Sequence, residues 1–348
     1  MLSIIIAILI FGLIIAVHEL GHFISAKACG IRVNEFALGM GPRLIHFKKG
    51  ETEYSLRLFP IGGFCAMEGE DSESEDKRAF RSKPVWQRII VVSAGAIVNL
   101  LTGVILTVVL ASMYNSIPTT IVDKFAQNPE NGNYTAFSYE GGLREGDEIL
   151  RINGLKVFTY SDISYKISAD AGKPFTLEVK RDGNKIILEN ISFGTENSGE
   201  GRDFAIKTLP KSFGNVWSYS LKDSVSTARL IWISLGDLLK GRYGADELSG
   251  PVGTISVIGE AASTGRDTRE KAMSLLNLTI FISINVGIFN LLPIPALDGG
   301  RLVFLVIEAI RRKPIKPEYE AYVHAVGMLL LFGLMIFATY NDIIRLKN

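Results

Sequence analysis

The sequence predicts a multi-pass α-helical membrane protein with four transmembrane helices, a membrane-associated β-hairpin region and an inserted α+β domain. Three stretches contain no Asp, Glu, Lys or Arg and are long enough to cross about 30 Å of hydrocarbon. A fourth apolar stretch is interrupted only by a His–Glu pair. Charged residues still make up 21 % of the 348 residues, so the segments between the apolar stretches are polar.

The charge balance and the cysteine content exclude two classes of protein. The chain has 37 basic and 36 acidic residues, which leaves a net charge of +1 and no basic excess for binding nucleic acid. Its two cysteines, Cys29 and Cys65, do not suffice for a disulfide-stapled secreted domain. Nucleic acid is therefore not an expected partner. The apolar stretches described above make the lipid bilayer one.

The first predicted transmembrane helix covers residues 2–26. Its apolar part, Leu2–Val17, runs into His18 and Glu19 before the apolar pattern resumes. A cleaved signal peptide is the alternative, because residues 26–29 imitate a cleavage site. The absence of a basic segment before the apolar run, and the His–Glu pair within it, favour a retained helix.

The other three predicted transmembrane helices cover residues 89–113, 272–292 and 321–340. Each lies in an uncharged stretch, and His324 is the single residue among them whose side chain ordinarily titrates near neutral pH. Prolines after residue 292 end the third helix.

The distribution of Lys and Arg predicts the orientation. Residues 27–88 contain eleven of these basic residues, and residues 301–316 contain five. Basic segments near helix ends stay in the cytosol, so both regions are expected there. The N-terminus and residues 114–271 are then extracytoplasmic, although Arg345 and Lys347 argue weakly for the reverse.

A β-hairpin region is predicted over residues 31–67. Residues 44–48 and 53–58 alternate like strands and flank a Lys-Gly-Glu-Thr turn. Glycine- and proline-containing motifs punctuate the ends of this hairpin. We expect a small sheet at the cytosolic face of the membrane, followed by a charged, solvated loop over residues 69–78.

Residues 114–209 are predicted to form one inserted extracytoplasmic domain, because short strand-like runs follow one another at turn signals. Residues 210–271 are predicted to form an amphipathic interfacial segment. Apolar residues recur at helical spacing over 216–240, and charges such as Asp223 and Arg229 argue against a fifth span.

The sequence His18-Glu19-Leu20-Gly21-His22 is an HExxH motif. Two histidines four residues apart share one helix face and reach one metal ion, and the glutamate points at the attacking water. Zinc suits two imidazoles with an oxygen ligand and an open position. The alternative is a polar patch that pairs with a neighbouring helix, but ionisable residues within a membrane more often mark function.

A third ligand is needed, and Asp298 is the candidate. It follows Asn290 and two prolines, Pro293 and Pro295, which break the helix and free backbone groups. The alternative is that Asp298 caps the following helix, Leu302–Ile310. Both interpretations remain open on spacing alone.

These motifs resemble the site-2 protease family of intramembrane zinc metalloproteases, of the bacterial RseP type. The resemblance rests on HExxH in a first membrane helix and NxxPxPxLDGG in a later one. Further matches are GMGP, ETEYSLRLFPIGGF, RSKPVWQRIIV and LSGPVG. The inserted domain, with GGLREGDEI followed by Asn-Gly, resembles a single PDZ domain.

The resemblance implies that His18, His22 and Asp298 bind Zn²⁺, that Glu19 is the catalytic base, and that Asn290 holds the substrate backbone. The chain departs from the family in three ways. It has Gly-Ala at 95–96 where a Gly-Pro step is common, one PDZ-like domain instead of a tandem pair, and no recognisable carboxylate-binding loop in 123–137.

We therefore expect a zinc-dependent endopeptidase of the bacterial cytoplasmic membrane, with its active site toward the cytosolic side. Its expected substrates are transmembrane segments of single-pass membrane proteins, either anti-sigma-factor-like proteins in regulated intramembrane proteolysis or signal-peptide remnants. The alternative is a catalytically silent membrane scaffold that recruits partners through its PDZ-like domain.

Overall fold

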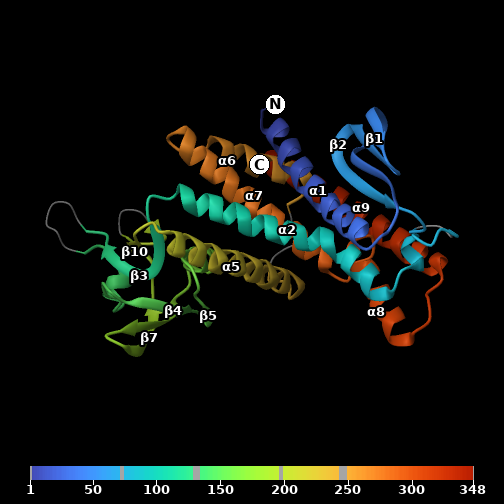
Figure 1. Ribbon diagram of the computed structural model, residues 1–348. Helices are drawn as coiled ribbons and strands as arrows, with labels where there is room; N and C mark the ends of the chain where they lie inside the picture. The colour runs from blue at the N-terminus through green and yellow to red at the C-terminus, as the bar shows by residue number, and fades with distance from the viewer. Residues whose placement is uncertain (1, 71–73, 128–133, 196–198, 243–248, 348) are drawn as a thin grey trace. The chain divides into compact units, whose positions relative to one another are not determined.

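The chain folds into two compact units. The computed structural model describes residues 2–70, 74–127, 134–195, 199–242 and 249–347 (Figure 1). The first unit comprises Met1–Leu106 and Gly236–Asn348, and the second comprises Thr107–Leu235.

The described residues contain four helices long and apolar enough to cross a membrane, in agreement with the four predicted. They are α1 (Leu2–Ala28), α2 (Val85–Met113), α7 (Thr268–Leu291) and α9 (Pro317–Lys347). The observed helices are longer than the predicted ones because their ends include polar turns. At the start of α7, for example, the Asp267 side chain accepts a hydrogen bond from the Glu270 N–H at 2.8 Å.

Helix α6 (Pro251–Ser263) corrects the prediction that residues 210–271 are one interfacial segment. It packs against α1, α7 and α9 in the first unit. Its Ile258 is fully buried in a cluster with Ile14 and Ile282. Glu260 is the one charged residue of this helix, so most of its surface is free to pack against apolar neighbours.

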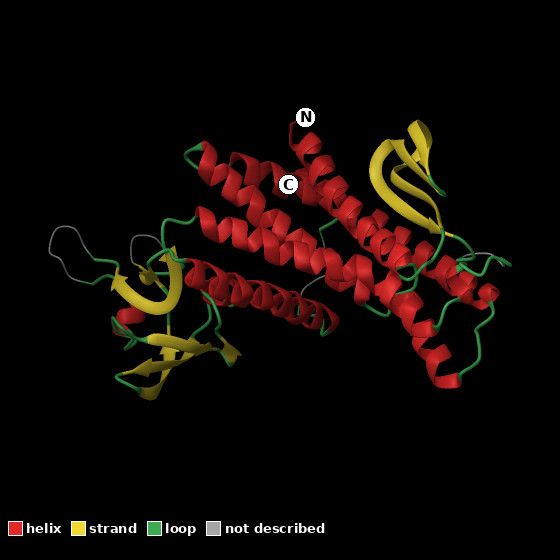
Figure 2. Cartoon of the chain, in the orientation of Figure 1, coloured by secondary structure: helices red, strands yellow, loops and turns green. Residues whose placement is uncertain are grey.

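Strands β1 (Val33–Lys49) and β2 (Thr52–Met67) form an antiparallel sheet that bends back on itself (Figure 2). Phe36 of β1 pairs with both Tyr54 and Cys65, so the first part of β1 lies between the two ends of β2. The predicted strands at 44–48 and 53–58 are only the outer part of this sheet. The glycine motifs lie inside the strands, where Gly39 and Gly62 adopt positive φ angles that allow the bend.

Ion pairs tie α8 (Asp298–Arg311) to neighbouring segments of the first unit. Arg88 in the first turn of α2 forms a double ion pair with Glu308, and both side chains are largely buried. Arg301 pairs with Glu70. The described ends of the charged loop predicted at 69–78 are therefore partly bonded, and residues 71–73 lie outside the described residues.

The second unit is an α+β domain built on a six-stranded antiparallel sheet with strand order β10-β3-β4-β6-β7, in which β5 pairs with β4. A short two-stranded sheet and helices α3 and α4 accompany this sheet. The main apolar cluster of the domain includes Leu143, Ile152 and Ile163, and a second cluster joins Ile117 to Val216 and Tyr219. Its strands and helices have the following bounds: β3 Ile117–Phe125, α3 Phe137–Glu140, β4 Glu148–Ile152, β5 Leu155–Lys156, α4 Tyr160–Ala169, β6 Phe175–Arg181, β7 Asn184–Ile191, β8 Gly194–Thr195, β9 Gly199–Glu200, β10 Phe204–Leu209. The likeness to a PDZ domain stays a prediction.

Helix α5 (Phe213–Leu239) shows why the predicted boundary at residue 209 does not separate two structural units. Thr159 and Ser161, at the start of α4, donate hydrogen bonds to Asp223 of α5 at 2.9 and 2.7 Å. Arg229 of α5 pairs with the fully buried Asp162 at 2.5 Å. These buried polar contacts join the first six turns of α5 to the inserted domain.

Candidate metal centre

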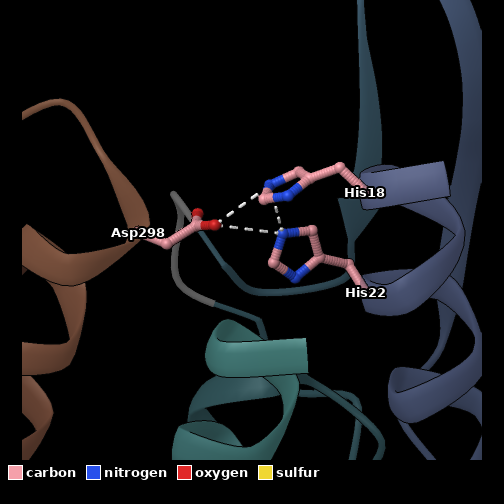
Figure 3. A group of neighbouring side chains, drawn as sticks. All are labelled: His18, His22 and Asp298. Carbon is pink, nitrogen blue, oxygen red and sulfur yellow. Dashed lines mark hydrogen bonds and ion pairs between the residues drawn. The ribbon is translucent and has the colours of Figure 1, made fainter. Parts of the chain in front are cut away.

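Three predicted site residues converge in the first unit (Figure 3). The Nε2 atoms of His18 and His22 lie 3.1 Å apart. Asp298 Oδ2 lies 3.1 Å from the first and 3.3 Å from the second. Residues separated by most of the sequence thus bring one nitrogen or oxygen atom each to a common point.

The donor set fits zinc. Tetrahedral coordination at zinc–nitrogen and zinc–oxygen distances of about 2.0–2.2 Å separates neighbouring ligand atoms by about 3.3 Å, close to the observed spacing. Asp298 Oδ2 is buried and makes no hydrogen bond among the described residues. A buried carboxylate oxygen that faces two ring nitrogens is best satisfied by a cation. Three protein ligands would leave a fourth position open, as catalytic zinc sites require.

Helix α1 and its neighbour α2 orient the histidine rings. The HExxH spacing places both rings on one face of α1. His22 Nδ1 donates a hydrogen bond to the Val91 carbonyl oxygen at 2.8 Å, which leaves the Nε2 lone pair free for a metal.

Asn99 of α2 is a site residue to which sequence reasoning assigned no role. It is fully buried, its amide lies 3.4 Å from His18 Nδ1, and its Oδ1 has no described partner. Rotating the amide lets Oδ1 accept from the His18 Nδ1–H and satisfies both groups. A buried asparagine in a predicted membrane helix was the available signal.

The segment between α7 and α8 delivers Asp298. Helix α7 ends at Leu291, and Pro293 and Pro295 prevent its continuation. A Cβ atom on Gly299 would lie 2.6 Å from the carbonyl carbon of Leu292, so this tight reversal requires glycine. Leu297 is the N-cap of α8, and the Asp298 carboxylate points to the histidines. The interpretation of Asp298 as a helix cap is therefore wrong.

Glu19 lies between the histidines and strand β2. Its half-buried side chain accepts a hydrogen bond from the Cys65 N–H, and a Cβ atom on Gly63 would lie 3.2 Å from Glu19 Cγ. Burial, together with the nearby Glu19 carboxylate, raises the pKa of the Cys65 thiol. This thiol therefore stays protonated and does not compete as a nucleophile.

Asn290 and the other two histidines of the chain lie outside the three-residue cluster. Asn290 is half-buried in the last turn of α7, eight positions before Asp298. His46 is exposed on the β1–β2 sheet, 3.0 Å from Glu53. His324 of α9 accepts a hydrogen bond from the Ala296 N–H.

An HExxH helix joined by a distant aspartate among membrane-spanning helices defines a class, the membrane-embedded zinc metalloproteases. Residues 6–334 match Peptidase family M50, and the chain belongs to this family, which comprises the site-2 proteases. The protein is accordingly an intramembrane zinc metalloprotease.

Relatives match over almost the whole chain. A Clostridium perfringens protein whose name assigns it provisionally to the zinc metalloproteases is 38 % identical over 98 % of each chain. Zinc metalloprotease RasP of Bacillus licheniformis is 34 % identical over 97 % of this chain and 98 % of its own. The regulator of sigma-W protease RasP of Bacillus subtilis is 33 % identical over 97 % of each.

We expect Gly95→Ala to weaken zinc binding by about tenfold or more, the range reached when groups that support metal ligands are disturbed. A Cβ atom at residue 95 of α2 would lie 2.8 Å from His18 Nε2, so the ring must leave its present position beside Asp298. Titration of the purified protein with a competing chelator measures the affinity.

Gly103→Ala is the matched control on the same helix. A Cβ atom there would press against Ile284 of α7 and away from the histidines. Both variants are expected to lose thermal stability, but only Gly95→Ala is expected to lose zinc affinity. Equal zinc affinity in the two variants would contradict the placement of the rings against α2.

Proposed function

We propose that His18, His22 and Asp298 bind the catalytic zinc and that Glu19 is the base that hydrolyses peptide bonds in transmembrane segments of single-pass membrane proteins. The observation that carries this proposal is the convergence of the two Nε2 atoms and Asp298 Oδ2 beside Glu19. When bound, zinc supplies Lewis-acid activation of the attacking water and the scissile carbonyl.

Glu19 performs the proton transfers in this proposal. Its carboxylate takes a proton from the attacking water as the carbonyl carbon is attacked, and it then passes that proton to the leaving amine nitrogen. The hydrogen bond from the Cys65 N–H orients the carboxylate between strand β2 and the two histidines. Its half-buried position limits the access of bulk water, which strengthens electrostatic interactions during the reaction.

The substrate is held as an added strand beside residues 63–67 of β2. This segment pairs with β1 on one side and lies next to Glu19. A transmembrane helix hides its carbonyls in hydrogen bonds, so it must unwind before cleavage, and pairing with a strand edge satisfies the released backbone groups. Asn290 is proposed to bind further exposed backbone groups.

The proposed clients are anti-sigma-factor-like membrane proteins. The name of the Bacillus subtilis relative, which describes that protein as a regulator of sigma-W, supports this choice. Signal-peptide remnants are the second candidate, because they too are short membrane helices. Profiling the membrane peptides that accumulate in a Glu19→Gln strain distinguishes the two. The catalytically silent scaffold is disfavoured, since the donor set and Glu19 are both intact.

We expect Asp298→Asn to lose most of its bound zinc, because the site loses its anionic ligand. Glu19→Gln is expected to retain zinc while peptide cleavage falls by about 10²–10⁴-fold, the usual contribution of a general base. Metal analysis by mass spectrometry and cleavage of a transmembrane peptide measure the two effects.

Glu260→Gln in α6 is the matched control for removing a carboxylate from the first unit, and it should retain both zinc and activity. Full zinc content in Asp298→Asn and Asp298→Ala would remove Asp298 from the ligand set. Unchanged cleavage in Glu19→Gln would exclude Glu19 as the base.

We propose that the N-terminus and the inserted domain are extracytoplasmic and that the β1–β2 sheet is cytosolic. In a chain with Cys29 and Cys65 replaced by serine and alanine, we expect an impermeant maleimide on intact cells to label Lys185→Cys but not Lys49→Cys. Lys185 is 71 % exposed and Lys49 is exposed, so burial does not obscure the result.

Permeabilised cells provide the control for this orientation test, because both introduced cysteines should then react. The reverse pattern on intact cells would invert the topology. The native Cys65 is buried and is a poor reporter. Asn131 is another position for an introduced cysteine in the predicted extracytoplasmic domain, but it lies outside the described residues.

The inserted domain is proposed to limit access and not to perform chemistry, because residues 114–209 contain neither histidine nor cysteine. Deletion of this domain would leave Asp223 and Arg229 of α5 without their hydrogen-bond and ion-pair partners. The test therefore keeps the domain in place. We expect the intact enzyme to cleave a substrate lacking its extracytoplasmic domain at least about tenfold faster than the full-length substrate. Quantitative immunoblots of membranes follow both.

Arg181→Ala is the companion variant for the access test. It leaves the fully buried Asp147 without its ion-pair partner, which destabilises the inserted domain by about 3–5 kcal/mol. We expect it to narrow the difference between the two substrates. Equal cleavage of both substrates by the intact enzyme would exclude a role in access.

A further inference from the structure

We propose that His324 of α9 is a positioning residue for the metal centre. By accepting a hydrogen bond from the Ala296 N–H, it holds the turn that carries Asp298 to the two histidines. This inference rests on the proposed role of Asp298 as a zinc ligand. It gives a function to the one histidine of the fourth predicted membrane helix, for which sequence spacing offered no context.

The turn needs a stabilising contact from another element because Ala296 has an unfavourable backbone conformation. Its φ angle is +74°, in the left-handed region where a Cβ atom crowds the backbone. Such a conformation persists in a non-glycine residue when surrounding contacts impose it. Ala296 lies two residues before Asp298, so relaxation of this φ angle changes the direction in which the carboxylate is presented.

The hydrogen bonds of the backbone N–H groups in the turn show which of them is stabilised from outside the turn. The Ile294 N–H donates to Leu292 O at 2.7 Å, and the Leu297 N–H donates to Ile294 O at 3.2 Å. The N–H of Ala296 instead donates to a side chain outside the turn, His324 Nδ1, at 3.0 Å. An unsatisfied N–H is costly where water is excluded, so the acceptor stabilises this particular geometry.

Two further contacts place the imidazole at this position. Gly327 is one turn along α9 from His324, and a Cβ atom there would lie 2.7 Å from the carbonyl carbon of Pro295. Helix α9 therefore contacts the turn directly. The His324 ring also lies against Phe304 of α8, with 6.0 Å between ring centroids. His324 thus touches both the turn before Asp298 and the helix that Asp298 begins.

The role requires an acceptor at the Nδ1 position. The neutral ring with its proton on Nε2 provides this acceptor, and asparagine places its Oδ1 at a comparable distance from the backbone. Phenylalanine retains a flat ring beside Phe304 but has no acceptor. These two replacements separate the hydrogen bond from the packing of the ring.

The test compares zinc affinity in His324→Phe and His324→Asn by chelator competition on the purified protein. We expect about a tenfold loss in His324→Phe, the lower end of the effects seen when groups behind metal ligands are removed, and near-normal affinity in His324→Asn. With Co²⁺ in place of zinc, the visible absorption bands should shift in His324→Phe and stay in place in His324→Asn. His46→Phe, on the exposed sheet, is the control for loss of a histidine.

Unchanged affinity in His324→Phe would overturn the proposal, and so would equal losses in the two variants, because ring packing would then explain them. If His324→Phe is not monodisperse, His324→Leu takes its place with the same expectations. Asp298→Ala is measured alongside. If that variant binds zinc normally, the proposed ligand set fails; if it loses zinc while His324→Phe retains it, only the role of His324 fails.

Discussion

The approach of two imidazole nitrogens and one carboxylate oxygen to within about 3.3 Å of one another is the constraint on which the membrane-spanning unit depends. The three groups come from α1 and α8, so the backbones of both helices and of α2 must meet around them. This explains why Gly95 and Gly299 lie where any Cβ atom would collide with a ring or a carbonyl. It also explains the buried Arg88–Glu308 pair, which anchors α8 to α2 away from the metal centre.

The same unit satisfies several of its buried polar groups by hydrogen bonds between its own elements, as a water-free environment favours. Val91 O accepts from His22, Asn99 O accepts from Ser283 at 2.8 Å, and the Ala296 N–H reaches His324. Each of these contacts joins two different helices or a helix and a turn. These hydrogen bonds therefore offset the desolvation penalty of the polar groups they join, and they also determine how the helices align.

Much of this arrangement could be predicted from local patterns in the sequence. The apolar runs indicated four membrane helices, and the spacing of His18 and His22 indicated a shared helix face. Local patterns did not reveal that α6 joins the membrane helices or that β1 pairs with β2 twice, because both depend on contacts distant in sequence. The boundary at residue 209 was missed for the same reason, since Asp223 looked like a solvated charge on an interfacial helix. His324 had no recognisable role until the turn at Ala296 was seen beside it.

The distance along the chain between His22 and Asp298 has a consequence for synthesis of the enzyme. The histidines insert into the membrane with the first helix, whereas the aspartate leaves the ribosome only after most of the chain has been made. If the three residues bind the metal as proposed, a partly synthesised chain lacks one of its ligands. Completion of the proposed site would then coincide with assembly of the helices near the end of the chain.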